Sequence, residues 1–426
     1  MFDALVNAFR TPDIRRRILF VAGMLIIYRL LGHVPVPGVE RQVLAQFLGS
    51  QPFLQLINLF SGGGLSDLSI VALAMTPYIN ASIIMQLMTG VVPRLQQLSR
   101  EGEYGRNKIN QYTRYLTVPL AFLQAYGTLA ILAQAEVILQ FDLARFETLI
   151  QMFTLAGGAI LVMWLGELIT ERGIGNGISF IIFAGIVAGL PAGLGQFAAA
   201  PDLARGILFT LLAVVAVAVI VYIQEGQRRI PIQYASRVRG RRMYQGGATF
   251  LPLRVNQAGV IPIIFAISIL AFPFQIASYF AVSEGVIGEI ATSITQILAP
   301  NGGVYIAGYF LLTVGFTYFY TAFTFKPDET ADQLRKNGGF IPGIRPGAPT
   351  RDYLARVVFR ISLAGAIFLG IVAVSPVLIE TVFSGSVVAG FALGGTALLI
   401  IVSVVVETMK QIEAQLMMRN YEGFIR

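Results

Sequence analysis

The sequence of 426 residues contains no cysteine and a single histidine, His33. The absence of cysteine excludes a disulfide framework, a Cys-x-x-Cys redox pair and a thiolate metal site. A Ser-His-Asp triad or a multi-histidine metal site would have to use His33, which stands beside Pro35 and Pro37 after a long apolar stretch, where an interfacial histidine is the simpler interpretation. The phosphate-binding pattern GxxxxGK[ST], HExxH and GxSxG are also absent. We therefore expect no catalytic site, no metal site and no cofactor.

Charge is scarce as well. Charged residues make up 13% of the chain and hydrophobic residues 55%, whereas a soluble domain carries roughly 25% charge. The apolar residues fall in blocks of about 20, the length that crosses a hydrocarbon core of roughly 30 Å. The sequence therefore predicts an all-α polytopic membrane protein. We expect ten transmembrane helices, at 18–33, 73–92, 112–133, 150–169, 178–190, 206–224, 257–279, 304–323, 357–379 and 387–406.

Basic residues indicate the orientation of these spans. With the N-terminus inside, the inner segments hold 27 of the 31 Lys and Arg residues, the outer segments hold 3, and Arg29 lies within the first span. Such an excess is typical of cytoplasmic loops, so both termini are expected in the cytoplasm. No small-residue cleavage site follows the first span, which we therefore expect to be retained.

Residues 53–70 are half apolar and are interrupted by three glycines and Asp67. This segment is too short and too broken to cross the membrane. We interpret it as a re-entrant or capping segment, which is tolerated at membrane depth where protein or a water-filled cavity surrounds it.

Two inner loops, at about 225–256 and 324–356, are much longer than the 4–6 residues that most connections need. Topology alone explains the sign of their charge but not their length. In the second loop, prolines and glycines frame Arg345 and favour turns that would hold it near a loop tip. A natural partner for such loops is an anionic surface, either ribosomal RNA or an acidic protein face.

Acidic residues are missing from the middle of the predicted spans, where proton- or sodium-coupled transporters usually keep them. The polar groups inside the spans are neutral: Asn80, Gln86, Gln124 and Ser268. This composition suits a conduit better than a pump. It leaves a secondary transporter or facilitator of a small solute as the alternative.

Seven segments, in the same order along almost the whole chain, resemble the SecY family. They are 60–66, 76–86, 101–103 with 111–114, 167–179, 258–262, 340–346 and 415–423. One departure is visible, because the family pattern has a glycine where this chain has Ala74.

The resemblance implies a channel for unfolded polypeptide, built from two five-helix halves that form a clamshell around a central pore. The halves would be 18–190 and 191–406, flanked by cytoplasmic segments 1–17 and 407–426. The family's ring of apolar pore residues maps onto Met75, Ile79, Ile186, Ile264, Ile400 and, less directly, Ile269. Such a constriction gates by dewetting. Most family members have isoleucine at the position of Met75.

The resemblance also assigns the plug and the lateral gate. The plug would be the segment at about 53–70, centred on Leu59, Phe60, Ser61, Gly62, Gly63, Gly64 and Leu65. The lateral gate would lie between spans two and seven, with Asn80 and Ser268 joined by Gln124 of span three in a neutral polar seam. Through this seam a hydrophobic segment would leave for the lipid.

The partners implied by the family are the small membrane subunits SecE and SecG, the SecA motor ATPase or a translating ribosome, signal peptides with unfolded preproteins, and membrane lipid. The location implied is the bacterial cytoplasmic (inner) membrane. The contact with the motor or ribosome would be made by Arg237, Arg239, Arg241, Arg242, Arg254 and Arg345. The energy would come from that partner.

Overall fold

The computed structural model describes the greater part of the chain. The described residues are 9–38, 43–44, 46–47, 58, 62–135, 137–138, 141–142, 145–198, 203–234, 237–239, 242–244, 247–281, 285–299, 302–382 and 395–423.

A helix occupies the position of each predicted span. These helices are α2 (Pro12–Leu31), α5 (Thr76–Val91), α7 (Glu103–Gln134), α8 (Phe146–Arg172), α9 (Gly177–Ala198), α10 (Leu203–Glu225), α11 (Ile261–Phe280), α13 (Gly303–Thr324), α15 (Ala348–Val382) and α16 (Gly395–Gly423). Among the described residues, six of them are long and apolar enough to cross a membrane: α7, α8, α11, α13, α15 and α16. Of the other four, α5 has only 16 residues and α2 begins with a cluster of charged residues, whereas the apolar stretches counted in α9 and α10 are limited to Gly177–Pro191 and Thr210–Glu225.

Several of these helices extend beyond the predicted spans. Helices α7 and α15 begin nine residues earlier than expected, at Glu103 and Ala348. Helix α16 ends at Gly423 rather than near 406, and residues 387–394 of the predicted tenth span lie outside the described residues. The apolar run marks the part of a helix that sits in lipid. The helical hydrogen bonds continue into the polar turns that follow it.

Two helices were not expected from the apolar pattern. Helix α6 (Pro93–Arg100) is polar and follows α5, and helix α12 (Val286–Ile297) begins after Gly285, whose φ of 94° suits glycine. A third short helix, α14 (Pro327–Lys336), starts with a proline in its first turn, where the missing N–H has no partner in any case.

The two long loops fold together as one sheet, which an all-α expectation missed. Strands β1 (Gln227–Tyr234) and β4 (Ala248–Arg254) form an antiparallel hairpin, and β5 (Gly339–Phe340) adds to the other edge of β1. Two short strands, β2 (Arg237–Arg239) and β3 (Arg242–Tyr244), pair with each other. The sheet packs on α14 and α15 through an apolar cluster that includes Ile230, Ile232, Leu253, Leu334, Leu354 and Val358.

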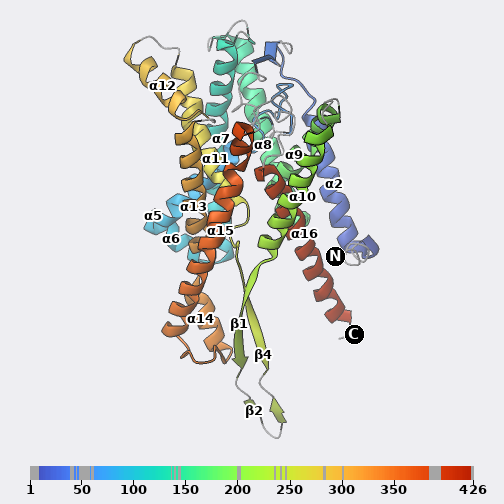
Figure 1. Ribbon diagram of the computed structural model, residues 1–426, viewed down its shortest axis with the longest axis vertical. Coiled ribbons are helices and arrows are strands. Elements are labelled where there is room, and N and C mark those ends of the chain that lie inside the picture. The colour runs from blue at the N-terminus through green and yellow to red at the C-terminus, as the bar shows by residue number, and fades with distance from the viewer. Residues whose placement is uncertain are drawn as a thin grey trace.

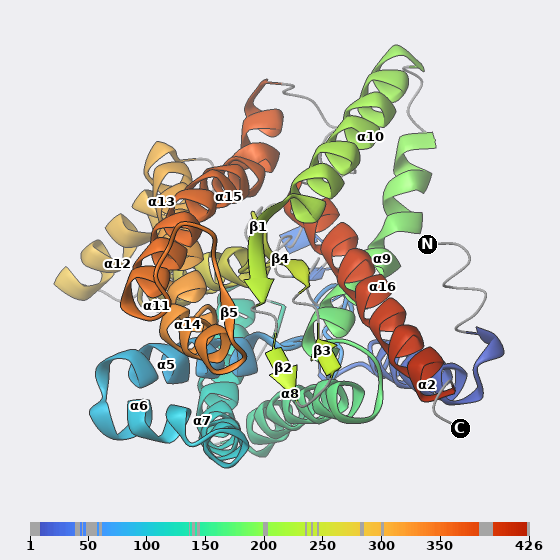
Figure 2. The same cartoon turned by 90° about the horizontal axis from the view of Figure 1, so that it is seen from below.

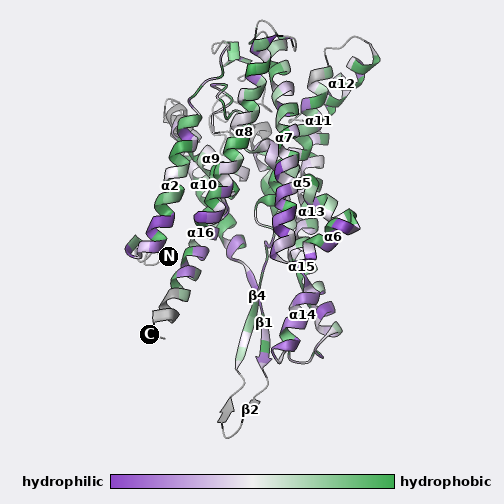
Figure 3. Cartoon of the chain, turned by 180° about the vertical axis from the view of Figure 1, so that it is seen from behind, coloured by the Kyte–Doolittle hydropathy of each residue, from purple (hydrophilic) through white to green (hydrophobic). Residues whose placement is uncertain are grey.

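The helices stand side by side along the long axis of the molecule, and the β1–β4 hairpin projects from one end (Figure 1). Both chain termini and α14 lie on the hairpin side, and α12 lies at the opposite end. Figure 2 shows α5, α7 and α8 on one side of the molecule and α11, α13 and α15 on another. Hydrophobic residues dominate the helices, whereas hydrophilic residues gather in α14, α6 and the hairpin (Figure 3).

Contacts between helices divide the chain into two groups. Helices α2, α5, α7, α8 and α9 contact one another, and so do α10, α11, α13, α15 and α16. The two groups meet where α11 contacts α5 and α7, and where α16 contacts α9. This is the arrangement of two five-helix halves.

Candidate functional site

Residues 62–70 form a chain of turns that lies inside the first half. Gly62 and Gly63 have φ angles of 67° and 84°, values that favour glycine. A Cβ on Gly62 would lie 2.7 Å from the Cα of Gly185 in α9, so the two backbones touch directly. Leu65 and Leu68 are buried in an apolar cluster with residues of α7 and α8. We call residues 62–70, a described part of the plug predicted at about 53–70, the plug segment; Leu59, Phe60 and Ser61 lie outside the described residues.

Three hydrogen bonds hold the plug segment against the end of the first span. The backbone N–H of Val36 donates to the Leu68 carbonyl at 2.9 Å, and that of Ile70 donates to the Val34 carbonyl at 2.9 Å. The guanidinium of Arg29, on α2, donates to the Gly62 carbonyl. Sequence reasoning found Arg29 only as a charge near the outer end of the first span.

Most of the predicted ring residues lie in one apolar cluster where the two halves meet. Ile186, Ile264 and Ile400 are buried there, and Ile79 and Ile269 pack against it. Gly185, which touches the plug segment, directly precedes Ile186. The plug segment therefore lies beside this cluster.

Met75 belongs to a neighbouring cluster with residues of α2 and α8, against which Ile79 also packs. A Cβ on Gly166 of α8 would lie 3.2 Å from the Met75 Cε, so the end of this side chain is directed toward α8. Met75 also lines a cavity of about 60 Å³ between α5, α9 and α11, together with Ile79 and Ile264.

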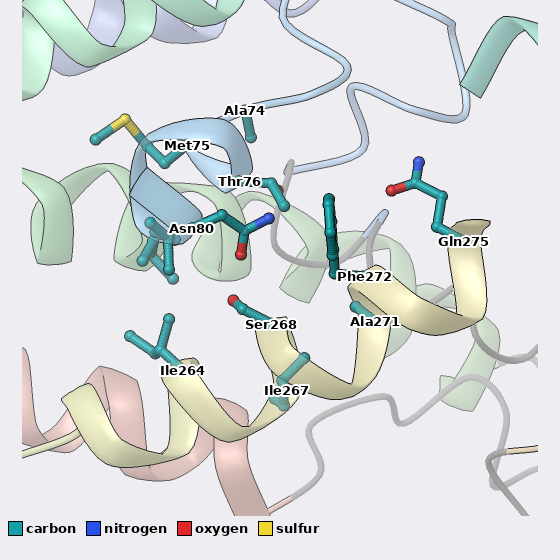
Figure 4. A pocket seen from close by; sticks show the side chains of 12 residues that line it. Ala74, Met75, Thr76, Asn80, Ile264, Ile267, Ser268, Ala271, Phe272 and Gln275 are labelled. Atoms are coloured by element: carbon teal, nitrogen blue, oxygen red, sulfur yellow. The ribbon is translucent and has the colours of Figure 1, made fainter. Parts of the chain in front are cut away.

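Two of the three predicted gate residues face each other across this cavity. Asn80 of α5 and Ser268 of α11 point their polar ends toward one another in Figure 4. Gln124 of α7 is buried, and its Nε2 has no hydrogen-bond partner in the part of the chain that the structure describes. No hydrogen bond links these three side chains to one another among the described residues.

A hydrogen bond across the seam joins two residues that sequence reasoning missed. The Gln275 Nε2 of α11 donates to the Thr128 Oγ1 of α7 at 3.2 Å. Gln275 is seven residues after Ser268, and Thr128 is four residues after Gln124, so each pair shares a helix face. This spacing from Ser268 and Gln124 is the sequence signal that could have identified Gln275 and Thr128. We call the contact of α11 with α5 and α7 the gate seam.

Ala74 lies directly before this site and has a φ of 46°. Only glycine enters this left-handed region without steric cost. The left-handed backbone conformation therefore explains why the family pattern has glycine at this position. Ala74 is buried, in the chain of turns that leads into α5.

The predicted contact arginines lie on the folded loops. Arg254 ends β4, and Arg345 lies between Gly343 and Gly347, whose φ angles are 81° and 105°; both arginines are exposed. Strands β2 and β3 carry Arg237, Arg239 and Arg242, and Arg241 lies outside the described residues. Since β5 pairs with β1, both loops present their basic residues from one unit.

At the hairpin end of the helices, Arg114 of α7 forms an ion pair with Glu167 of α8 at 2.6 Å. The described residues contain no group of three or more His, Asp or Glu side chains that could bind a metal ion.

Sequence comparison finds relatives along the full length. The SecY family profile matches residues 69–409. The chain is 46% identical over 447 residues to the protein translocase subunit SecY of Mycobacterium bovis, with 100% of both chains covered. It is 46% identical over 442 residues to the same subunit of Streptomyces galbus, again with 100% of both covered.

Structure comparison finds protein-conducting channels. A structure described as that of a protein conducting channel has a TM-score of 0.63 and 18% identity, covering 93% of this chain and 91% of that one. A second structure has a TM-score of 0.64, 18% identity and the same coverage. Its description states that the plug domain of that SecY protein stabilises the closed state of the translocation channel and maintains a membrane seal. Sec61 in the canine ribosome-channel complex has a TM-score of 0.59 and 17% identity, with 93% and 91% covered.

Proposed function

Because this chain belongs to the SecY family, we propose that its pore ring, plug segment and gate seam together pass unfolded secretory polypeptides across the cytoplasmic membrane and release hydrophobic segments sideways into the lipid. The chain is a multi-pass membrane protein and the channel subunit of a protein translocase, not an enzyme. No observation favours a transporter of small solutes. The observation that carries the mechanism is the contact of Gly62 with Gly185, next to Ile186.

The pore ring closes the channel by exclusion of water. Ile186, Ile264 and Ile400 are almost completely buried, and they come from α9, α11 and α16 of the two halves. A constriction lined by such side chains dewets, which blocks ions without a charged barrier. Branched side chains part for a polypeptide without leaving buried polar groups unpaired, and they close again behind it.

The plug segment reinforces this closure. Its backbone lies against α9 at Gly185, and Leu65 and Leu68 bury their side chains between α7 and α8. Its release requires the loss of this apolar contact and of the Arg29 hydrogen bond to Gly62. A chain that enters the pore supplies the replacement contacts.

The gate seam is the sideways exit. Helix α11 of the second half meets α5 and α7 of the first there, with the Asn80–Ser268 cavity between them. Polar groups across helices contribute roughly 0.6–2 kcal/mol in membranes. A contact of this size holds the seam at rest and yields to a sufficiently hydrophobic signal segment.

The sheet is the docking unit for the partner that drives transport, either the SecA motor or a translating ribosome. Relatives of this fold have been solved with ribosomes: Sec61 in a canine ribosome-channel complex, and a yeast Ssh1 complex on the 80S ribosome. Arg254, Arg345 and the arginines of β2 and β3 give the unit the positive charge that such a partner requires. SecE and SecG are the small membrane subunits expected beside the helices.

The orientation in the bacterial inner membrane follows from the same charges. The inner segments hold 27 of the 31 basic residues, which directs them to the cytoplasm. The hairpin, α14 and both chain termini lie toward one end of the molecule (Figure 1), which supports a cytoplasmic location for both termini.

Reconstitution tests the proposal. Vesicles that contain the chain with SecE and SecG should take up a secretory preprotein when SecA and ATP are added, and the product should become protected from protease. Vesicles with SecE and SecG alone provide the control. Absence of protected preprotein in the presence of an active motor, with the chain correctly inserted, would refute the proposed function.

A further inference from the structure

A hydrogen bond closes the gate seam at a distance from Asn80 and Ser268, whose side chains face each other without a hydrogen bond among the described residues. We propose that the hydrogen bond between Gln275 and Thr128 is an outer latch that sets how hydrophobic a segment must be before the seam opens for it. The inference deepens the proposed function of the seam and rests on it. It makes Gln275 and Thr128 positioning residues that determine specificity.

The latch lies at the far end of the cavity. Gln275 and Asn80 both line the cavity, and Figure 4 shows them at opposite ends of it. Gln275 is seven residues after Ser268, which is about 10 Å along a helix. Helix α5 begins only at Thr76. At the level of Gln275 the contact across the seam is therefore made by α7.

The latch also lies beyond a proline in α11 that removes one helical hydrogen bond. Pro273 stands inside this helix and has no N–H to donate to the carbonyl four residues earlier. The turn that carries Gln275 is consequently less firmly tied to the rest of α11 than an unbroken helix would be. A cross-link from this turn to α7 restrains a part of the gate that the central contacts do not hold.

The two partners depend on the latch to different degrees. A threonine hydroxyl in a helix can bond to a backbone carbonyl one turn earlier, as Thr113 and Thr117 of the same helix do. Among the described residues, the Gln275 amide nitrogen bonds to Thr128 and to no carbonyl of its own helix, and an open seam would leave it facing lipid or an apolar segment. The free-energy penalty for opening therefore falls on Gln275. A more hydrophobic incoming segment offsets more of this penalty, because its own insertion into the lipid is more favourable.

One neighbouring polar group confirms that the contact is selective. Gln124 stands one turn before Thr128 on α7, and its buried Nε2 is unpartnered among the described residues. Of these two α7 side chains, Thr128 bonds to α11 and Gln124 does not, within the part of the chain that the structure describes. Removal of the Thr128 hydroxyl leaves the Gln275 amide without this partner.

The test uses precursors whose signal cores differ by one leucine at a time, in vesicles driven by SecA and ATP. We expect Gln275→Leu to shift the threshold to less hydrophobic signals, with roughly threefold more transport of a marginal precursor. Thr128→Val should shift it in the same direction, and the double variant should shift it no further than Gln275→Leu alone. Thr128→Ser keeps the hydroxyl and should restore the wild-type threshold.

Ser278→Ala is the matched control. Ser278 is on the same outer turn of α11, but its hydroxyl donates to the Phe274 carbonyl of its own helix at 2.8 Å, so its loss should leave the threshold unchanged. An unchanged threshold in Gln275→Leu, or additive shifts in the double variant, would overturn the latch.

A precursor with a strong signal separates failure of the latch from failure of the proposed function. If all variants transport it at the wild-type rate and the threshold does not move, only the latch fails. If wild-type vesicles do not transport it, the proposed function fails.

Discussion

Ala74 carries a β-carbon in a backbone conformation that favours glycine. Its φ of 46° places it in the left-handed region, which costs an L-residue roughly 1–2 kcal/mol. The position lies between the plug segment and α5, so a movement that let residue 74 leave this conformation would release the strain. That release would favour the movement.

Ala74→Gly should relieve this strain and stabilise the resting fold by about 1 kcal/mol, offset in part by the larger entropy of glycine in the unfolded chain. Thermal unfolding of the detergent-solubilised complex measures the effect. Ala72→Gly is the control, because Ala72 is buried in the same turns without a positive φ, and that change should destabilise. Equal destabilisation by both variants would show that Ala74 is not strained.

Replacement of Ile79 and Ile186 together by serine should leave a folded channel that leaks ions, because polar side chains allow water to stay in the constriction. Conductance in planar bilayers should rise several-fold above background. The control replaces Ile84 and Ile207, whose side chains are exposed on α5 and α10. Background conductance of the Ile79 and Ile186 variant would remove these residues from the barrier.

The sequence alone predicted the ring only through its family resemblance. Isoleucine in a membrane helix usually faces lipid or packs between helices, and nothing in the composition separates Ile186 from Ile84. The gate pair Asn80 and Ser268 stood out because polar residues are rare within spans. Thr128 escaped notice because its hydroxyl can bond within its own helix, so its position alone indicates no partner.

At the scale of elements, the plug segment is held by a direct contact between backbones. Gly62 touches Gly185 of α9, and a Cβ atom on residue 62 would lie 2.7 Å from the Gly185 Cα. Gly63 has a similar φ, but the nearest atom to its Cβ would be the Ser66 Oγ at 3.6 Å. The two glycines thus separate the effect of steric overlap from that of backbone strain.

Gly62→Ala should displace the plug segment from α9 and raise the resting ion leak, whereas Gly63→Ala should cost stability through its φ and leave the seal largely intact. The two variants are compared by planar-bilayer conductance and by thermal unfolding. If they leak equally, the contact with Gly185 does not contribute to the seal.

Charge reversal at Arg345 should abolish motor-stimulated transport while the protein itself inserts normally. Arg345 is exposed in the turn between β5 and α15, where two glycines with positive φ fix the backbone. Arg345→Glu is compared with Arg356→Glu, which makes the same change in net charge at an exposed position of α15 outside the turn. The measurement is SecA-dependent uptake of a preprotein into vesicles. Equal losses in both variants would reduce Arg345 to a general contributor of charge.

At the scale of the whole molecule, the hydrophobic blocks located the membrane helices, because burial in lipid requires long apolar runs. They did not locate the sheet. Pro231 and Pro252 interrupt the alternating pattern of β1 and β4, and the third strand comes from a different loop. The apolar alternation of Ile230 and Ile232 was the signal for β1. Pairing across more than 100 residues leaves no trace in local periodicity.

The β1–β4 hairpin has a mechanical consequence. Strand β1 has eight residues, which extends roughly 25 Å. Its base is closed by the bond from the Val255 N–H to the Gly226 carbonyl at 2.9 Å. The same base rests on α15, where a Cβ on Gly365 would lie 2.6 Å from the Val255 carbonyl oxygen. The hairpin is thus anchored at its base against α15. Since α11 starts at Ile261, shortly after that anchor, a force applied at the tip of the hairpin would reach α11 directly along the chain.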